Sequence, residues 1–153
     1  MIHSIEVRDF NLEATLESGQ VFGFARSNGA YSGLIKGRRF QLWQKKNKFY
    51  AESSKGNSDK IQDFLKDYFD LERDLTVIRQ ILEREEPLKE FWKPVWGLRL
   101  IRQNSWEALA CFIISSNNNV KRIQGIWRNL SQLSAQSGAF PLHSGGAVPS
   151  VGP

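Results

Sequence analysis

The stretch from residue 97 to residue 122 constrains the fold most, because it predicts two helices joined by an abrupt polar break. After Ser105, which is a predicted N-cap, apolar residues recur at helical spacing. Cys111 and Phe112 add to them and make this helix apolar nearly all round. A helix of this kind is expected to be central to a hydrophobic core.

The break between the two helices is built from hydroxyl and amide side chains: Ser115, Ser116, Asn117, Asn118 and Asn119. Such side chains compete for backbone hydrogen bonds and favour turns over helix interiors. A second helix follows, with Lys121 and Arg122 at its start. One interpretation is a turn that only caps two helices. The other is a surface that contacts base edges and phosphates, because Asn offers a donor and an acceptor while Lys and Arg supply charge.

A specific pattern runs through this stretch: GLRLIRQ at residues 97–103, Phe112-Ile113, the Ser/Asn run of residues 115–119, and Arg122. A second pattern, ESGQVF, lies earlier at residues 17–22. Together they resemble the 8-oxoguanine DNA glycosylase family, of the helix-hairpin-helix glycosylase/lyase superfamily. The resemblance covers most of residues 3 to 141, and its two patterns stand in the order that the family shows.

The predicted fold class is α+β. Residues 3 to about 52 alternate apolar and polar side chains as an antiparallel sheet does, with Asn28-Gly29 as a hairpin turn and Asn11 as the cap of a short helix. Helical stripes follow, and Phe91, Trp92 and Trp96 are expected to anchor a core. The resemblance implies that the sheet belongs to a TATA-binding-protein-like domain with flanking helices, followed by the start of an all-helical glycosylase domain.

Three segments are expected in the chain. Residues 3–70 form the sheet-and-helix domain, and residues 71–136 supply the first helices of the helical glycosylase domain. Residues 137–153 are rich in Gly, Pro and Ser and contain no charge. This last segment is expected to be a tail without a packed core, or the product of a truncated or frame-shifted gene.

The resemblance assigns roles to named residues. Family members flip a damaged purine out of the duplex, which costs a few kcal/mol. By resemblance, the backbone carbonyl of Gly19 recognises the lesion, since 8-oxoguanine carries a hydrogen at N7 where guanine has an acceptor. Asn117 enters the gap and, with Arg122, contacts the unpaired cytosine. The supporting residues that shape the junction are Ser115, Ser116, Asn118 and Asn119. A simple turn glycine is the alternative for Gly19.

No catalytic residue is predicted in this chain. The resemblance implies a catalytic lysine and an assisting aspartate downstream of the matching residues, with the helix-hairpin-helix itself. Lys121 is expected to face phosphate or solvent instead. The chain is therefore expected to be inactive alone and to recognise duplex DNA that carries an oxidised purine opposite cytosine. A non-catalytic DNA-binding module and a structural or interaction domain with incidental basic charge are the alternatives.

The composition and charge of the chain limit which of these functions are possible. The net charge of +5 and the pI near 9.5 permit binding to nucleic acid. The single cysteine, Cys111, excludes an internal disulfide and is expected to be a buried core thiol. Only His3 and His143 could add imidazole ligands, so neither a metal site nor a cofactor is expected. No apolar run has membrane-spanning length and no leader pattern follows Met1, which favours an intracellular, soluble monomer, in the cytoplasm and nucleoid or in the nucleus depending on the source.

Overall fold

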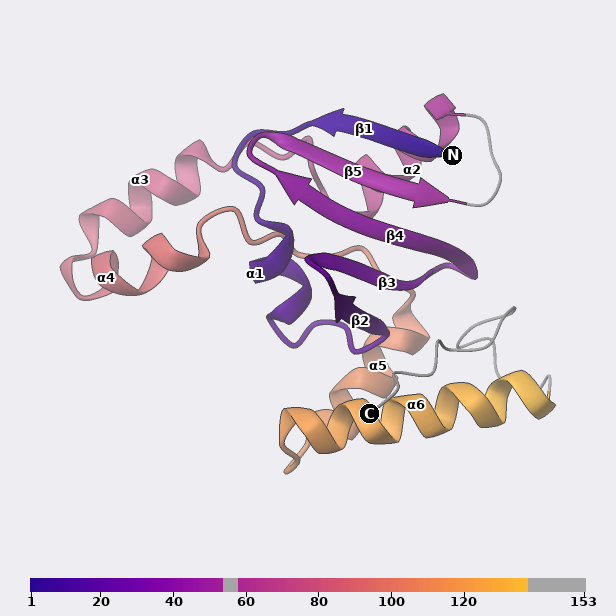
Figure 1. The fold of residues 1–153 in the computed structure, drawn as a ribbon. Helices are drawn as coiled ribbons and strands as arrows, with labels where there is room; N and C mark the ends of the chain where they lie inside the picture. Colours follow the sequence, from indigo (N-terminus) through magenta and orange to yellow (C-terminus); the bar gives the residue numbers. More distant parts are fainter. Residues whose placement is uncertain (54–57, 138–153) are drawn as a thin grey trace.

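A five-stranded antiparallel sheet dominates the first third of the chain in the computed structural model, which describes residues 1–53 and 58–137 (Figure 1). The strands are β1 (Ile2–Glu6), β2 (Phe24–Ser27), β3 (Ala30–Ile35), β4 (Arg38–Lys45) and β5 (Lys48–Ser53). Their order in the sheet is β1-β5-β4-β3-β2, with every neighbouring pair antiparallel. The predicted α+β class, an antiparallel sheet with flanking helices, is confirmed.

The β2–β3 hairpin turns where the sequence predicts it. Asn28 and Gly29 both have positive φ, at 49° and 75°, and Ser27 pairs with Ala30. Positive φ at both central residues defines the tight turn whose twist matches that of the strands. Asn11 also caps α1 (Leu12–Glu17) as predicted, because its side chain accepts a hydrogen bond from the amide of Ala14 at 2.9 Å.

One face of the sheet carries the main core. Phe40 and Leu42 of β4 are buried, whereas Gln41 between them is exposed, and the same alternation continues through β5. The helix α2 (Ser58–Tyr68) buries Ile61 and Leu65 in the same cluster. Aromatic rings also meet within this cluster: Phe49 packs edge to face on Phe10 and on Phe69 with ring centroids 5.3 Å apart, and Phe10 and Phe69 pack at a tilt with centroids 5.6 Å apart.

The segment after α2 forms an arm at one side of the sheet (Figure 1). It contains α3 (Thr76–Arg84), a 3-10 turn η1 (Glu86–Leu88), α4 (Lys89–Trp92) and a second 3-10 turn η2 (Lys93–Val95). The prediction that Phe91 anchors a core is wrong, because its side chain is 77% exposed. Trp92 and Trp96 are partly buried and pack edge to face at 5.3 Å. The short turns around Pro87 and Pro94 separate these elements, so their apolar residues do not share one face.

The helices α5 (Ser105–Ser115) and α6 (Val120–Ser137) pack against each other beyond the β2 edge of the sheet (Figure 1). They share a small second core: Ala110, Cys111, Ile114, Ile123 and Trp127. α5 contributes Ala110, Cys111 and Ile114 to a core, as predicted, but it is not central to that core, because Phe112 is 74% exposed and Ile113 is 60% exposed. The predicted N-cap is also shifted by one residue. Asn104 caps α5 by accepting from the amide of Trp106 at 2.8 Å, and Ser105 is the first helical residue.

Part of the chain lies outside this description. The predicted Gly/Pro/Ser-rich tail of residues 137–153 falls there from residue 138 onward, as do residues 54–57. Within residues 1–53 and 58–137, none of the helices combines the length and the apolar character needed to cross a membrane.

Candidate nucleic-acid interface

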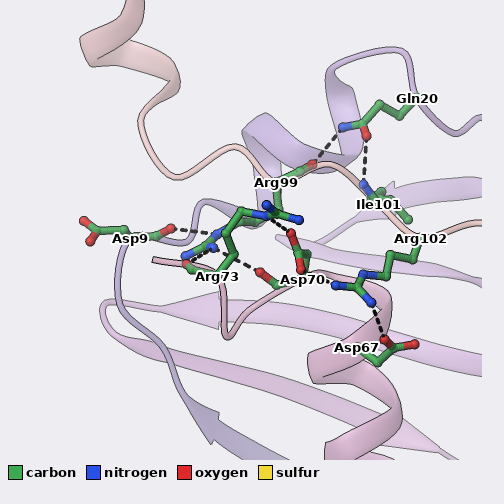
Figure 2. A network of polar contacts seen from close by, with 8 residues as sticks. All are labelled: Asp9, Gln20, Asp67, Asp70, Arg73, Arg99, Ile101 and Arg102. Atoms are coloured by element: carbon green, nitrogen blue, oxygen red, sulfur yellow. Dashed lines mark hydrogen bonds and ion pairs between the residues drawn. The ribbon is translucent and has the colours of Figure 1, made fainter. Parts of the chain in front are cut away.

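The two stretches that carry the family resemblance lie against each other, although about 80 residues separate them. The side chain of Gln20 joins them (Figure 2). Its Nε2 donates to the carbonyl of Arg99 at 2.9 Å, and its Oε1 accepts from the amide of Ile101 at 2.9 Å. In return, Nε2 of Gln103 donates to the carbonyl of Gln20 at 3.0 Å. The stretch that contains Gly19 is thereby fixed to the segment that leads into α5.

Arg99 anchors this segment to the main core. Its side chain is only 3% exposed, and its guanidinium donates to backbone carbonyls (Figure 2). The acceptors are the carbonyl oxygens of Arg8, Asp9, Asp70 and Arg73, at distances between 2.7 and 3.0 Å. Burial lowers the pKa of Arg99, while the nearby carboxylates of Asp70 and Asp9 raise it. A guanidinium stays protonated in proteins, so Arg99 provides a structural junction and no proton chemistry.

Asp70, whose backbone carbonyl accepts from Arg99, also carries a carboxylate that pairs with neighbouring arginines. Its carboxylate is paired with Arg73 and, at 2.8 Å, with Arg102, which also reaches Asp67 at 3.1 Å. Burial raises the pKa of Asp70, but the hydrogen bonds from Arg73 and Arg102 outweigh it, so the net shift is downward. The exposed guanidinium of Arg102 is therefore paired with carboxylates of the protein itself.

Gly19 lies in an exposed turn after α1 with φ of +87°. This conformation favours glycine, because a Cβ is disfavoured there even though no neighbour lies within 4 Å of the place it would occupy. Gly19 borders an open cavity of about 350 Å³. Val120 and Gln124 in the first turns of α6 line the same cavity. The structure thus brings Gly19 near the start of the helix that carries Arg122.

The Ser/Asn run forms a tight link between α5 and α6. Asn117 adopts a left-handed conformation with φ of 55°, which Asn tolerates better than most residues. Asn118 donates from Nδ2 to the carbonyl of Ile114 at 2.8 Å and to that of Ser116 at 3.2 Å. Asn119 accepts from the amide of Arg122 at 3.0 Å and so caps α6. Ser115 donates to the carbonyl of Phe112 at 2.8 Å.

These bonds divide the run into two groups. Asn118, Asn119 and Ser115 use their side chains to close the bend. Asn117 and Ser116 are exposed. Lys121 and Arg122 are exposed as well, in the first turn of α6. The junction therefore presents an amide side chain and two cations from one corner of the molecule, which is the composition that contacts to bases and phosphates require.

Two titratable side chains of α5, Cys111 and Glu107, are not activated for nucleophilic chemistry. Burial raises the pKa of Cys111 to about 11, with a further contribution from Glu107, so the thiol stays protonated at neutral pH. Its predicted burial is confirmed. Burial also raises the pKa of Glu107. In the part of the chain that the structure describes, no group of three or more His, Cys, Asp and Glu residues could hold a metal ion.

Sequence reasoning missed Gln20, Gln103 and Arg99 as positioning residues. All three lie inside the stretches that carry the resemblance, so a signal was present. A polar residue in a matching stretch that has no assigned contact to DNA is a candidate for a structural contact. Its partners could not be inferred, because they lie about 80 residues away.

A family model for the N-terminal domain of 8-oxoguanine DNA glycosylase matches residues 3–109. The chain belongs to this family. The match includes both the Gly19 turn and the Arg99 segment, so the contact through Gln20 lies inside the region that the 8-oxoguanine DNA glycosylase family model covers.

Solved structures of 8-oxoguanine DNA glycosylases share the fold. MBOgg1, in complex with a low-affinity DNA ligand, is 33% identical with a TM-score of 0.77 over 94% of this chain and 48% of its own. The 8-oxoguanine glycosylase/lyase of Clostridium acetobutylicum, bound to duplex DNA with cytosine opposite 8-oxoG, is 28% identical with a TM-score of 0.75, over 87% of this chain and 48% of its own. The chain spans about half the length of these proteins. A 3-methyladenine DNA glycosylase from Archaeoglobus fulgidus, 14% identical with a TM-score of 0.59, shows likeness of fold alone.

Proposed function

We propose that this chain recognises 8-oxoguanine opposite cytosine in duplex DNA, as the N-terminal part of a DNA glycosylase/lyase of base-excision repair. The observation that carries the proposal is the single corner of the molecule that contains both candidate contacts. Gly19 borders the same 350 Å³ cavity as Val120 and Gln124 in the first turns of α6; Arg122 lies between these two residues in sequence, and Asn117 three residues before the helix begins. Membership of the 8-oxoguanine DNA glycosylase family supports this reading.

On the lesion side, the carbonyl of Gly19 would meet the N7 edge of the extruded purine. In 8-oxoguanine that edge donates a hydrogen bond, and in guanine it presents a lone pair. A carbonyl is attracted to the first and repelled by the second. Discrimination of this kind requires a carbonyl whose direction is fixed before the base arrives.

On the opposite strand, Arg122 would donate to the acceptors of the unpaired cytosine, and Asn117 would fill the space that the purine leaves. An exposed amide in a bend that other side chains hold closed is suited to insertion, because little conformational freedom remains to be lost. Lys121, in the same turn, would contact phosphate. Action on genomic DNA would place the protein in the cytoplasm and nucleoid or in the nucleus.

Binding of the 153-residue chain to matched duplexes tests the proposal. The duplexes carry 8-oxoguanine or guanine opposite cytosine, and 8-oxoguanine opposite adenine, at two salt concentrations. We expect the 8-oxoguanine:cytosine duplex to bind most tightly. Arg122→Ala should weaken that binding by about 1–3 kcal/mol and reduce the preference for cytosine over adenine.

Arg128→Ala is the matched control, since it removes an equal charge from an exposed position of α6, six residues further on. It should lower affinity only through the salt-dependent term and leave the preference for cytosine intact. Equal affinity for all three duplexes would replace the proposal with a non-specific DNA-binding module, and no affinity at moderate salt would favour a structural domain.

A further inference from the structure

The Gly19 carbonyl belongs to the peptide group that joins Gly19 to Gln20, so the orientation of that carbonyl depends on both residues. Gly19, at φ of +87°, has access to more conformations than any other residue type. Nothing in the side chain of a glycine can limit this freedom. Restraint on the carbonyl must therefore come from the Gln20 side of the peptide group.

Gln20 is held at both its side chain and its backbone. Its amide group pairs with the backbone of Arg99 and Ile101 through one donor and one acceptor, as a neighbouring strand would, at 2.9 Å each. Its own carbonyl accepts from Gln103 at 3.0 Å. Its Nε2 also donates to the hydroxyl of Ser18 at 2.8 Å, which fixes the residue on the other side of Gly19.

The segment that Gln20 binds is itself attached to the main core. Arg99 is fastened to four backbone carbonyls from two other parts of the chain, and Ile101 is buried in the main core. The hydrogen bonds of Gln20 therefore fix an exposed turn to a segment that is anchored in the core. A side chain that only filled space could not do this, because directional hydrogen bonds are needed to fix a rotation.

We infer that Gln20 is a positioning residue for lesion discrimination, which holds the Gly19 carbonyl in the direction that separates 8-oxoguanine from guanine. This inference rests on the proposed function of Gly19. The role needs glutamine in particular. Glutamate lacks the donor and would set a carboxylate against the Arg99 carbonyl, and asparagine is one methylene too short to span the same two partners.

The test compares three duplexes whose purine opposite cytosine presents a different group at position 7: 8-oxoguanine, which also carries an oxygen at position 8, guanine and 7-deazaguanine. The third has neither the donor nor the acceptor at that position. The unsubstituted chain should bind 8-oxoguanine most tightly and guanine most weakly. Gln20→Ala should draw the three affinities together, with the ratio of 8-oxoguanine to guanine falling by about threefold to tenfold, the size expected of one hydrogen bond. Gln20→Glu should do the same.

A loss of folding cannot imitate this result, since a smaller folded fraction lowers all three affinities in proportion and leaves their ratios unchanged. Gln44→Ala is the matched control. Gln44 makes the same two-point contact at the other end of α1, to the amide of Leu12 at 2.8 Å and the carbonyl of Phe10 at 2.7 Å. It should cost stability and keep the ratios.

The outcomes separate the inference from the function beneath it. If Gln20→Ala keeps the same ratio of 8-oxoguanine to guanine affinity as the unsubstituted chain, the inference is overturned and the proposed function stands. If Gln44→Ala lowers the ratio of the 8-oxoguanine to the guanine affinity by the same factor, the inference is also overturned. Any destabilisation of α1 would then be enough to reduce discrimination. A chain with glutamine at position 20 that binds all three duplexes equally overturns the proposed function, and the inference with it.

Discussion

Single residues hold the two family stretches in place, and Gly97 shows the tightest fit among them. Its φ is +86°, and its carbonyl accepts from the amide of Asn11 at 2.9 Å. A Cβ at this position would lie 2.8 Å from the Asn11 nitrogen and 2.9 Å from the carbonyl carbon of Phe10. Both are backbone atoms, so neither can move aside without disturbing the start of α1.

Gly97→Ala is therefore expected to lower the free energy of unfolding by about 3 kcal/mol, through backbone strain and the clash together. Gly125→Ala is its control. Gly125 lies in the middle of α6 with no atom within 4 Å of the added methyl group, and alanine there should raise stability by about 0.5–1 kcal/mol. Urea denaturation followed by circular dichroism measures both. Equal effects of the two substitutions would contradict the close contact at Gly97.

Asp70 is a single residue that makes the folding stability of the chain depend on pH. Its pKa in the folded chain is lowered, because the hydrogen bonds from Arg73 and Arg102 outweigh the effect of burial. A carboxyl group with a lowered pKa contributes stability above its unfolded pKa of about 3.9, and that contribution is lost as the pH falls through the lower, folded value. The stability difference between the natural chain and Asp70→Asn should therefore be constant near neutrality and disappear in acid. A difference that persists at the lowest pH would show that the ion pairs are not its source.

At the scale of elements, α1 and the segment of residues 97–103 depend on tertiary contacts for their structure. The six residues of α1 are too few for an isolated helix to persist in water. Gln44 binds its start and Gln20 fastens the turn after its end. The segment of residues 97–103 contains neither helix nor strand, and buried Arg99 fixes it.

Arg99→Met should consequently destabilise the chain by about 3–5 kcal/mol, because it leaves buried carbonyls without their donors. Arg99→Lys should restore little, since an ammonium group cannot reach acceptors that spread around a planar guanidinium. Arg84→Met, at an exposed position at the end of α3, is the control and should change stability by less than about 0.5 kcal/mol. Recovery of most of the stability by lysine, measured by urea denaturation, would show that charge alone suffices at position 99.

For the molecule as a whole, the apolar face of α5 and α6 stands out. Large side chains remain exposed on these two helices: Trp106, Leu109, Phe112, Ile113, Val120 and Leu133. Several large exposed apolar side chains on one pair of helices favour association of the chain with itself and the binding of hydrophobic dyes. The chain spans about half the length of the solved glycosylases that it resembles, which have further chain available to cover such a face.

The 153-residue chain is accordingly expected to self-associate reversibly as its concentration rises and to bind a hydrophobic dye. The double substitution Phe112→Gln and Ile113→Gln should reduce both effects with little loss of stability, because both side chains are already exposed. Phe91→Gln is the control, because Phe91 is exposed as well and its helix α4 lies in the arm, apart from α5 and α6 (Figure 1). Sedimentation velocity over a range of concentrations measures the association. A monomer at every concentration, without dye binding, would contradict the expectation.

The sequence by itself determined the local structure and the family. Alternation predicts the strands, Asn28-Gly29 predicts the hairpin, Asn11 predicts a cap, and the Ser/Asn run predicts the break between α5 and α6; the structure confirms each of them. These features depend on interactions between residues a few positions apart, which the order of residue types records directly. The same holds for the two stretches that carried the family resemblance.

Only the tertiary structure decided which apolar surfaces are buried and which polar residues meet. Periodicity shows that α5 has apolar residues on every side, but it cannot show that Ala110, Cys111 and Ile114 find partners whereas Phe112 and Ile113 do not. The pairing of Gln20 with the backbone near Arg99 was likewise hidden, because 79 positions separate the two residues. Burial and pairing depend on which distant segments come together, and that is a property of the whole chain's packing rather than of any one stretch.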